Sequence, residues 1–244
     1  MSTDQKIALV TGATRGIGLE TVRQLAQANI VTLLAGRDAT RTKAAADSLK
    51  AEGLTVEPIV LDVTRPDSIE HAVAEVQSRF GKLDILVNNA GIMVEDPSKP
   101  PSQQSLKAWR ETFDTNLFAV VEVTNAFLPL LRKAPAARIV NVSSQLGSFG
   151  LHVDPASAIY NFKIPAYNAS KSALNAWTIH LAYELRDTPI KVNAIHPGYV
   201  KTEMNGGHGE IDIPTGAKSS VGMALIDADG PTGSFTYLGK TLPW

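Results

Sequence analysis

A tyrosine and a lysine stand four residues apart in the second half of the chain. Tyr167 and Lys171 belong to the stretch Tyr-Asn-Ala-Ser-Lys, which leads into a strongly helical run. Residues four apart lie on one face of an α-helix, so this spacing places a phenol beside an ammonium group. A nearby cation lowers the pKa of a phenol from about 10, and such a phenol can exchange a proton with a carbonyl or an alcohol. The same pair also arises by chance on solvated helices, so the chemistry needs support from the rest of the chain.

A glycine-rich turn near the N-terminus is a candidate phosphate-binding site. A short apolar run at 7–10 leads into the turn at 11–18, and an amphipathic helix follows. Glycines let the backbone turn tightly and approach a ligand, and the open end of the helix offers free N–H groups to a pyrophosphate. The spacing G-x-x-x-G-x-G differs from the commoner G-x-G-x-x-G, and a purely structural turn is the alternative. The position of the turn after the first strand favours dinucleotide binding.

The end of the second expected strand, at 31–35, indicates which dinucleotide binds. An acidic residue at this place selects the ribose hydroxyl of NAD, whereas an arginine accommodates the 2′-phosphate of NADP. Arg37 follows the strand and Arg15 lies in the glycine turn, so two guanidinium groups capable of bidentate contacts favour NADP(H). We expect Asp38 to be a turn residue or the N-cap of the next helix. Asp62, at the end of the third strand, is a candidate acceptor for the adenine amino group, with a turn residue as the alternative.

Strand and helix patterns alternate along the chain. The expected strands are 7–10, 31–35, 56–60, 83–87, 138–142, 192–195 and 233–237, and helices are expected over 41–52, 69–80, 106–116 and 117–133 and after Tyr167. This alternation predicts an α/β fold, a single-domain Rossmann-type doubly wound parallel sheet of about seven strands with helices on both faces. No linker or repeat is found, so residues 1–244 are expected to form one domain, with a cofactor half over about 1–142 and substrate-side elements over about 143–244.

Three connections are expected to be loops: the proline-rich segment 92–105, the segment 145–166 and the glycine-rich, mobile segment 204–220. The helix at 117–133 and the helix after Tyr167 are apolar on more than one face. Such helices need a second partner besides their own sheet. A subunit interface would supply it, in a homodimer or homotetramer, and an intramolecular cover is the alternative.

The composition excludes several classes of function. The net charge of −1 gives no electrostatic basis for nucleic acid or an anionic membrane as a partner. The chain has no cysteine, which excludes disulfides and thiolate chemistry, and the spacing of its five histidines suggests no metal site. No apolar run reaches the roughly 18 residues of a membrane span, and the N-terminus shows no signal-peptide pattern. We therefore expect a cytoplasmic protein.

Taken together and in this order, the motifs closely resemble those of the short-chain dehydrogenase/reductase family. They are the turn Thr11 to Gly18, Asn88-Asn89-Ala90-Gly91, Asn116, Ser144, Tyr167-x-x-x-Lys171 and Pro197-Gly198. The stretches 36–38 and 230–233 also resemble the NADPH-dependent carbonyl reductase branch of that family. The likeness covers nearly the whole chain.

The resemblance implies a role for each catalytic candidate. Tyr167 is the general acid in reduction, while Lys171 lowers its pKa and binds the nicotinamide ribose. Ser144 hydrogen-bonds the substrate carbonyl and stabilises the developing oxyanion, with the adjacent Ser143 as the alternative. Asn116 holds a water that links Lys171 to solvent as a proton relay. The cofactor performs the hydride transfer, and the protein supplies orientation and the proton.

The resemblance also implies a set of cofactor-binding residues. The glycines of the turn surround the pyrophosphate, Asn89 and Gly91 line the adenosine side, and residues within 197–202 hold the nicotinamide carboxamide. With the neighbours of these residues, the expected set is Gly12, Thr14, Arg15, Gly16, Ile17, Gly18, Arg37, Asp62, Val63, Asn89, Ala90, Gly91, Tyr167, Lys171, Pro197, Gly198, Val200 and Thr202. The connection 145–166 is longer than in the family's compact members, and this departure bears on substrate shape and assembly.

The expected function is NADPH-dependent reduction of a small or medium ketone or aldehyde to the alcohol, with NADPH/NADP+ as cofactor. The loops after Ile92, Ser144 and Thr202 would form the walls of an apolar substrate pocket. One alternative is a reductase of 3-oxoacyl groups bound to a carrier. The other is a non-catalytic NADPH-binding sensor on the same fold, against which the complete set of catalytic candidates argues.

Overall fold

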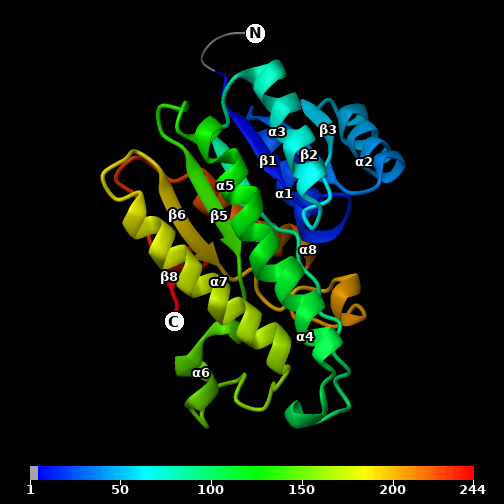
Figure 1. Ribbon diagram of the computed structural model, residues 1–244, viewed down its shortest axis with the longest axis vertical. Helices are drawn as coiled ribbons and strands as arrows, with labels where there is room; N and C mark the ends of the chain where they lie inside the picture. Colours follow the sequence, from blue (N-terminus) through cyan, green and yellow to red (C-terminus); the bar gives the residue numbers. More distant parts are fainter. Residues whose placement is uncertain (1–4) are drawn as a thin grey trace.

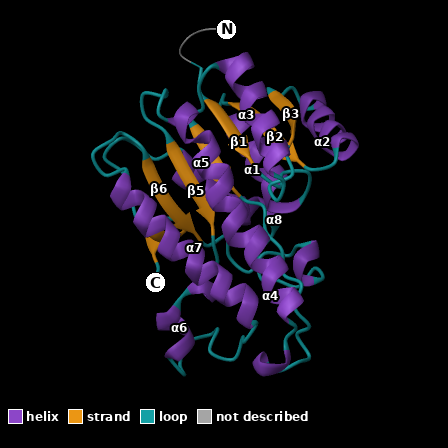
Figure 2. Cartoon of the chain, in the orientation of Figure 1, coloured by secondary structure: helices purple, strands orange, loops and turns teal. Residues whose placement is uncertain are grey.

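The sheet of this protein lies between two layers of helices (Figure 1, Figure 2). The computed structural model describes residues 5–244, so positions 1–4, part of the N-terminus in which no signal peptide is expected, lie outside the described residues. In that part eight strands follow the order β3-β2-β1-β4-β5-β6-β7-β8, and every neighbouring pair is parallel except β7 and β8. The strands are β1 (Ile7–Val10), β2 (Val31–Gly36), β3 (Val56–Val60), β4 (Ile85–Asn88), β5 (Arg138–Val142), β6 (Lys191–Ile195), β7 (Phe235–Tyr237) and β8 (Lys240–Thr241). The predicted doubly wound α/β fold is confirmed.

The helices are α1 (Gly16–Gln27), α2 (Ala39–Ala51), α3 (Pro66–Phe80), α4 (Leu106–Phe113), α5 (Ala119–Leu131), α6 (Phe149–Val153), α7 (Pro165–Glu184) and α8 (Ile213–Ala224). Each face of the sheet has its own apolar core. Helices α3, α5 and α7 pack on one face around Phe127, and α1, α2 and α8 pack on the other. Along β1, Ile7 and Leu9 enter the first core, while Ala8 and Val10 enter the second. Burial on both faces explains why β1 is apolar throughout.

The prediction of a loop over 204–220 is wrong for its second half, because residues 213–220 are helical. This segment contains most of α8, preceded by a short 3₁₀ turn, Glu203–Asn205. Glycine lowers helix propensity, which made the segment resemble a loop. Here Gly216 serves close packing instead, because a Cβ at this position would lie 2.6 Å from Cγ2 of Val200. Asp212 caps the helix by accepting a hydrogen bond from the backbone N of Thr215 at 2.9 Å.

Two other expected boundaries need correction. The segment 145–166 is not entirely a loop, because it contains a 3₁₀ turn, Gln145–Gly147, and the short helix α6, which Ser148 caps. The helices expected at 106–116 and 117–133 are not separated by a break. A π-helical turn, Asp114–Phe118, joins α4 directly to α5. The segment 92–105 is irregular as expected, apart from the 3₁₀ turn Pro101–Gln103.

The sheet has one strand more than the pattern predicts. β8 is two residues long and pairs with β7 through a tight hairpin. Both turn residues, Leu238 and Gly239, have positive φ, as a hairpin turn of this kind requires. A strand of two residues is too short to show an alternating apolar pattern, so it left no signal in the sequence.

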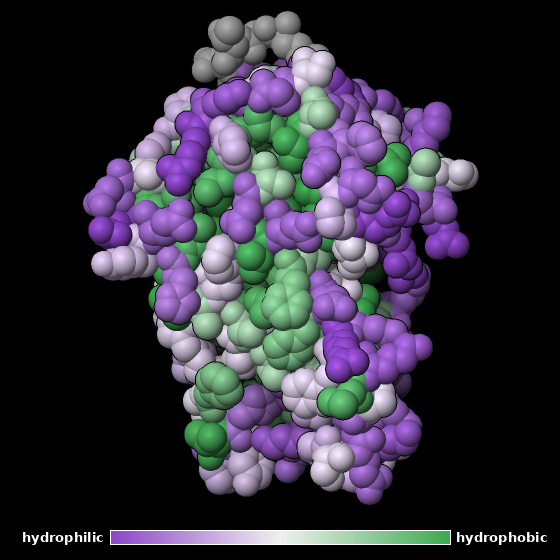
Figure 3. Space-filling view, viewed as in Figure 1, coloured by the Kyte–Doolittle hydropathy of each residue, from purple (hydrophilic) through white to green (hydrophobic). Residues whose placement is uncertain are grey.

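The face formed by α5 and α7 carries apolar surface (Figure 3). Phe118, beside α5, and Ile179 and Tyr183, on α7, are exposed there. This is the surface that the apolar excess of the two helices indicated, and the subunit interface itself stays a prediction. Within the described residues, no helix combines the length and apolar character needed to cross a membrane.

A buried polar network joins the sheet to the helices of this face. Asn88 and Asn141 are register partners on β4 and β5, and Nδ2 of Asn88 donates to Oδ1 of Asn141 at 2.9 Å. Asn88 also donates to Thr124 on α5 at 3.0 Å, and Asn141 donates to Thr178 on α7 at 2.9 Å. Because all four side chains are buried, their hydrogen bonds fix where α5 and α7 sit on the sheet.

We expect Asn141→Leu to lower the free energy of unfolding by about 2 kcal/mol, because it leaves an N–H of Asn88 buried without an acceptor. Urea denaturation followed by tryptophan fluorescence measures this loss. Asn125→Leu, at an exposed position of α5, is the matched control. An equal loss in the control would show that the effect comes from the aliphatic side chain and not from the network.

Candidate active site

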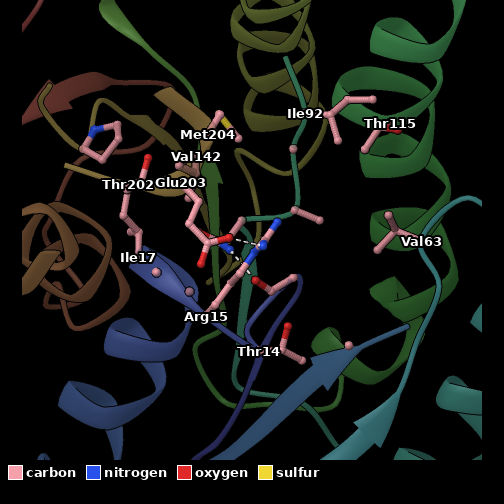
Figure 4. A pocket seen from close by; sticks show the side chains of 18 of the residues that line it. Thr14, Arg15, Ile17, Val63, Ile92, Thr115, Val142, Thr202, Glu203 and Met204 are labelled. Atoms are coloured by element: carbon pink, nitrogen blue, oxygen red, sulfur yellow. Dashed lines mark hydrogen bonds and ion pairs between the residues drawn. The ribbon is translucent and has the colours of Figure 1, made fainter. Parts of the chain in front are cut away.

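A cavity of about 920 Å³ opens at the carboxyl edge of the sheet. Its walls come from the segments that follow β1, β2, β3, β4, β5 and β6, together with residues of α7. The strand order reverses between β1 and β4, and open α/β sheets bind their ligands in the crevice at such a point. Figure 4 shows side chains from several of these segments pointing toward one another across the cavity.

The glycine turn is held tightly against the segment after β4. A Cβ at Gly12 would lie 2.9 Å from Cα of Ala90, and one at Gly18 would lie 2.4 Å from Nδ2 of Asn89. Asn89 donates from Nδ2 to the carbonyl of Thr11 at 2.9 Å and to that of Gly12 at 3.2 Å. The hydroxyl of Thr11 accepts from the backbone N of Asn89 and of Ala90. The motif Asn-Asn-Ala-Gly thus shapes the turn.

The two arginines expected to select NADP both line the cavity. Arg15 forms an ion pair with Glu203, which reaches across from the segment after β6 (Figure 4). Arg37 is exposed beside the end of β2. Asp62 also lines the cavity, and its Oδ1 accepts from the backbone N of Thr64 at 3.0 Å, so it acts as a turn residue as well. Asp38 caps α2, as expected, by accepting from the backbone N of Arg41 at 2.8 Å.

Tyr167 and Lys171 lie in the first two turns of α7, as their spacing predicts. The Nζ atom of Lys171 is 5.6 Å from the centre of the Tyr167 ring and donates to the carbonyl of Val142 at 2.8 Å. Lys171 is only 4% exposed, so its ammonium is held within the protein at the end of β5.

The predicted lowering of the Tyr167 pKa is wrong for this structure. Burial raises the pKa of Tyr167 to about 12, because it disfavours the phenolate, and interaction with the Ser144 hydroxyl only partly opposes this. Burial also lowers the pKa of Lys171 to about 8, because it disfavours the ammonium. The spacing gave the proximity of the two groups correctly, but it contained no information about their desolvation.

The two adjacent serines after β5 have different partners. The hydroxyl of Ser143 donates to Oδ1 of Asn175 at 2.6 Å, which ties the strand end to α7. The hydroxyl of Ser144 accepts from the backbone N of Leu146 at 3.1 Å and interacts with the phenol of Tyr167. Ser143 lines the cavity, whereas Ser144 is the serine beside the phenol.

Asn116 is fully buried in the π-helical turn between α4 and α5. Its Oδ1 accepts from the backbone N of Ile92 at 2.8 Å, and its Nδ2 donates to the carbonyl of Ile92 and to the hydroxyl of Ser170. Both hydrogens of the amide are thus used, and the side chain clamps the segment after β4 to α7. Single π turns in helices are frequent at functional sites. The water relay assigned to Asn116 stays a prediction.

Most of the expected residues meet in the cavity. Those that line it are Gly12, Thr14, Arg15, Gly16, Ile17, Gly18, Arg37, Asp62, Val63, Asn89, Ala90, Gly91, Tyr167, Lys171, Pro197 and Thr202. Gly198 and Val200 lie behind the wall: a Cβ at Gly198 would be 2.4 Å from Cδ1 of Ile211, and Val200 pairs with the same residue.

Several lining residues are not among the individual site residues expected from the sequence, although Glu203 and Met204 lie in the loop after Thr202 that was expected to form a wall of the pocket. These lining residues include Ile92, Thr115, Val142, Glu203, Met204 and Ile213. The position of Glu203 and Met204 directly after Thr202 was an available signal. The contact of Glu203 with Arg15 was not, because the two residues are 188 positions apart.

A doubly wound sheet with a glycine turn after its first strand is the architecture of dinucleotide-binding proteins. The chain matches the short chain dehydrogenase family over residues 6–211 and belongs to that family. It is therefore an NAD(P)-dependent oxidoreductase, and it acts on carbonyl or alcohol groups of small molecules.

Known proteins resemble this chain over nearly its whole length. A short-chain dehydrogenase of Penicillium roqueforti is 39% identical over 225 residues, which cover 89% of this chain and 88% of the relative. A (+)-neomenthol dehydrogenase of Capsicum annuum is 32% identical, with 97% of this chain and 96% of the relative covered. The structure of an NADPH-bound carbonyl reductase from chicken fatty liver has a TM-score of 0.85 at 29% identity, with 98% of this chain and 99% of that chain covered.

The buried Lys171 makes stability depend on pH. Its pKa is about 8 in the folded protein against 10.5 for an ordinary lysine, so between these values the unfolded chain binds more protons. Stability therefore rises with pH through this window, by on the order of 2–3 kcal/mol up to about pH 10. Above that pH the raised pKa of Tyr167 acts in the opposite direction.

Urea denaturation of the wild type and of Lys171→Met at pH values from 7.5 to 10 measures this dependence. We expect the variant to lose the rise, and Lys218→Met, at an exposed position of α8, to keep it. An unchanged slope in Lys171→Met would mean that its ammonium is not desolvated.

Proposed function

We propose that this protein is an NADPH-dependent carbonyl reductase that converts a ketone or an aldehyde to the alcohol. The observation that carries the proposal is that one cavity is lined both by the pair Tyr167 and Lys171 and by the two arginines beside the glycine turn. The first pair can supply a proton to a reacting carbonyl, and the arginines can bind a phosphate. In this proposal residues 1–142 form the cofactor half and 143–244 the substrate side.

The glycine turn fits a dinucleotide. Gly12 and Gly16 have positive φ, and the space beside Gly12 and Gly18 is too small for a Cβ. Within residues 5–244 no side chain caps the start of α1, so the N–H groups of its first turn remain available to a pyrophosphate. Arg15 and Arg37 would contact the 2′-phosphate, for which Arg15 must exchange its partner Glu203. When bound, NADPH supplies the hydride.

The protein would supply the proton from Tyr167. Because burial keeps its pKa near 12, the phenol is protonated at neutral pH and can donate to the carbonyl oxygen as negative charge develops there. Ser144, beside the phenol, would donate a second hydrogen bond to the same oxygen. Lys171, with a pKa of about 8, is mostly an ammonium at pH 7 and would stabilise the phenolate that remains.

The remaining roles follow the resemblance. Pro197, Gly198, Val200 and Thr202 would hold the nicotinamide carboxamide, Pro197 and Thr202 as direct neighbours and the other two from behind the wall. The names of the neomenthol dehydrogenase and of the carbonyl reductase support an alcohol–carbonyl pair as the reacting group.

We expect the wild type to oxidise NADPH in the presence of some members of a panel of aryl ketones, keto esters, diketones and aldehydes, as followed by absorbance. Tyr167→Phe should reduce turnover by about 10²- to 10⁴-fold, because the proton donor is lost. The dissociation constant of NADPH, measured by fluorescence titration, should change less than about threefold, since the ring remains.

Loss of binding and turnover together in Tyr167→Phe would show that the phenol holds the cofactor and does not act as the acid. Binding of NADPH by the wild type without turnover of any panel member would support the sensor alternative. Turnover of acyl groups on a carrier, but not of free ketones, would support the 3-oxoacyl reductase.

Arg37→Ala should weaken NADPH binding by about tenfold or more and leave NADH binding nearly unchanged, because only NADPH carries the phosphate that the guanidinium would contact. Titration of each cofactor measures the two affinities. Arg132→Ala, at the end of α5 where Arg132 pairs with Glu184, is the control and should change neither. Equal weakening of both cofactors by Arg37→Ala would contradict the assignment of Arg37 to the 2′-phosphate.

A further inference from the structure

Glu95 is a buried carboxylate in the irregular segment after β4, and the proposed reaction gives it no role. It is 8% exposed. Its Oε1 accepts from the backbone N of Ala166 at 2.8 Å, and its Oε2 accepts from the backbone N of Tyr167 at 2.6 Å. Both oxygens of the carboxylate therefore bind the first turn of α7, more than seventy positions further along the chain.

The start of α7 has no means of capping itself. The N-cap residue is Ile164, whose side chain cannot accept a hydrogen bond, and the first helical residue is Pro165, which has no N–H. The first helical bond runs from the backbone N of Asn168 to the carbonyl of Ile164 at 2.8 Å. The amides of Ala166 and Tyr167 are the free donors of this turn, and Glu95 accepts from both.

The charge of Glu95 is balanced by the helix. In the described part of the chain no lysine, arginine or histidine forms an ion pair with it. A carboxylate at the N-terminus of an α-helix is stabilised by the free N–H groups and by the positive end of the helix dipole. The Glu95 carboxylate is thus stabilised by the first turn of α7, and the free amides of that turn obtain their acceptors from Glu95.

The backbone of Tyr167 is held on both sides. Its N–H donates to Glu95, and its carbonyl accepts from the hydroxyl of Ser170 at 2.7 Å. Ser170 in turn accepts from Nδ2 of Asn116, which also binds the backbone of Ile92. The segment 92–95 is thus attached to Tyr167 at both of its ends, and Ile92 lines the cavity.

We propose that Glu95 is a positioning residue for Tyr167: it fixes the phenol relative to the cavity by holding the first turn of α7 to the segment 92–95. The proposal rests on the proposed function, in which Tyr167 donates the proton. Glu95 acts through the backbone of Tyr167 and touches no reacting atom, since both of its oxygens face main-chain amides. A misplacement of about 1 Å at a reacting group is enough to lower a rate by about 10²-fold.

Glu95→Gln tests this role, with Asp96→Asn as the matched control. The glutamine retains the shape of the side chain but presents an NH₂ group to one of the two amides, so one hydrogen bond is lost. Asp96 is the adjacent acid of the same segment; it is exposed, and its carboxylate binds Ser98 and not the helix. Both variants remove one negative charge from the same loop.

We expect Glu95→Gln to lower kcat at least tenfold while the dissociation constant of NADPH changes less than about twofold, and Asp96→Asn to change neither. In a Tyr167→Phe background, Glu95→Gln should change the residual rate less than about twofold, because its effect passes through the phenol. An equal fractional loss in that background, or a parallel loss of NADPH binding, would overturn the proposal.

Hydrogen exchange of the Ala166 and Tyr167 amides, measured by mass spectrometry without substrate, separates this proposal from the proposed function. Exchange should accelerate in Glu95→Gln and stay unchanged in Asp96→Asn. Unchanged exchange in Glu95→Gln would overturn the proposal whether or not the enzyme reduces carbonyls. If Glu95→Gln fails to fold, Glu95→Asp, which keeps the charge but is one methylene shorter, replaces it and should give the same pattern to a smaller extent.

Discussion

The burial of Lys171 at the carboxyl edge of the sheet is the constraint on which the rest of the site depends. An ammonium taken out of water needs acceptors in the protein, and here the carbonyl of Val142 and the ring face of Tyr167 face it. The end of β5 must therefore approach α7 closely. Gly147 permits this approach, because a Cβ there would lie 2.7 Å from the backbone of Lys171. The close contact of Gly147 with Lys171 positions the turn after β5, which carries both serines. The same contact positions the side of the cavity on which a substrate carbonyl would meet the phenol.

The same need to satisfy buried polar groups orients the whole of α7. A stripe of buried polar side chains runs along α7 from Lys171 through Ser172, Asn175 and Thr178. Each of the last three is hydrogen-bonded to β5 or to the turn after β5: Ser172 to the carbonyl of Gly147, Asn175 to Ser143, and Thr178 to Asn141. An apolar stripe could slide or rotate on its sheet at small cost. A stripe of buried hydrogen bonds cannot, since each displaced group would lose its partner. This is a physical reason for a helix that must keep a fixed position on its sheet to be polar on its buried face.

Much of this could be predicted from the sequence, and the failures have identifiable causes. The strands of the parallel sheet are short and mostly apolar, and the spacing of Tyr167 and Lys171 fixes their common face, so the sequence predicts both. The sequence does not predict helix α8, because Gly216 lowers helix propensity. In the structure this glycine is needed for another reason: a larger residue would clash with Val200. Contacts such as those of Glu95 with the start of α7 join positions far apart in the chain, and no local pattern predicts them. The predicted direction of the Tyr167 pKa shift is wrong because the spacing of the two residues predicts their proximity and not their burial.

Opposite charges meet at Tyr167, and they act on different parts of the residue. The carboxylate of Glu95 holds its backbone N–H, while the ammonium of Lys171 lies over its ring. Burial favours the neutral forms of Tyr167 and Lys171. It therefore raises the pKa of the phenol and lowers that of the lysine. The phenol therefore stays protonated well above the neutral range. Two separate features therefore act on Tyr167. Glu95, in the segment after β4, fixes the position of its backbone, and burial near the end of β5 sets the protonation state of its phenol.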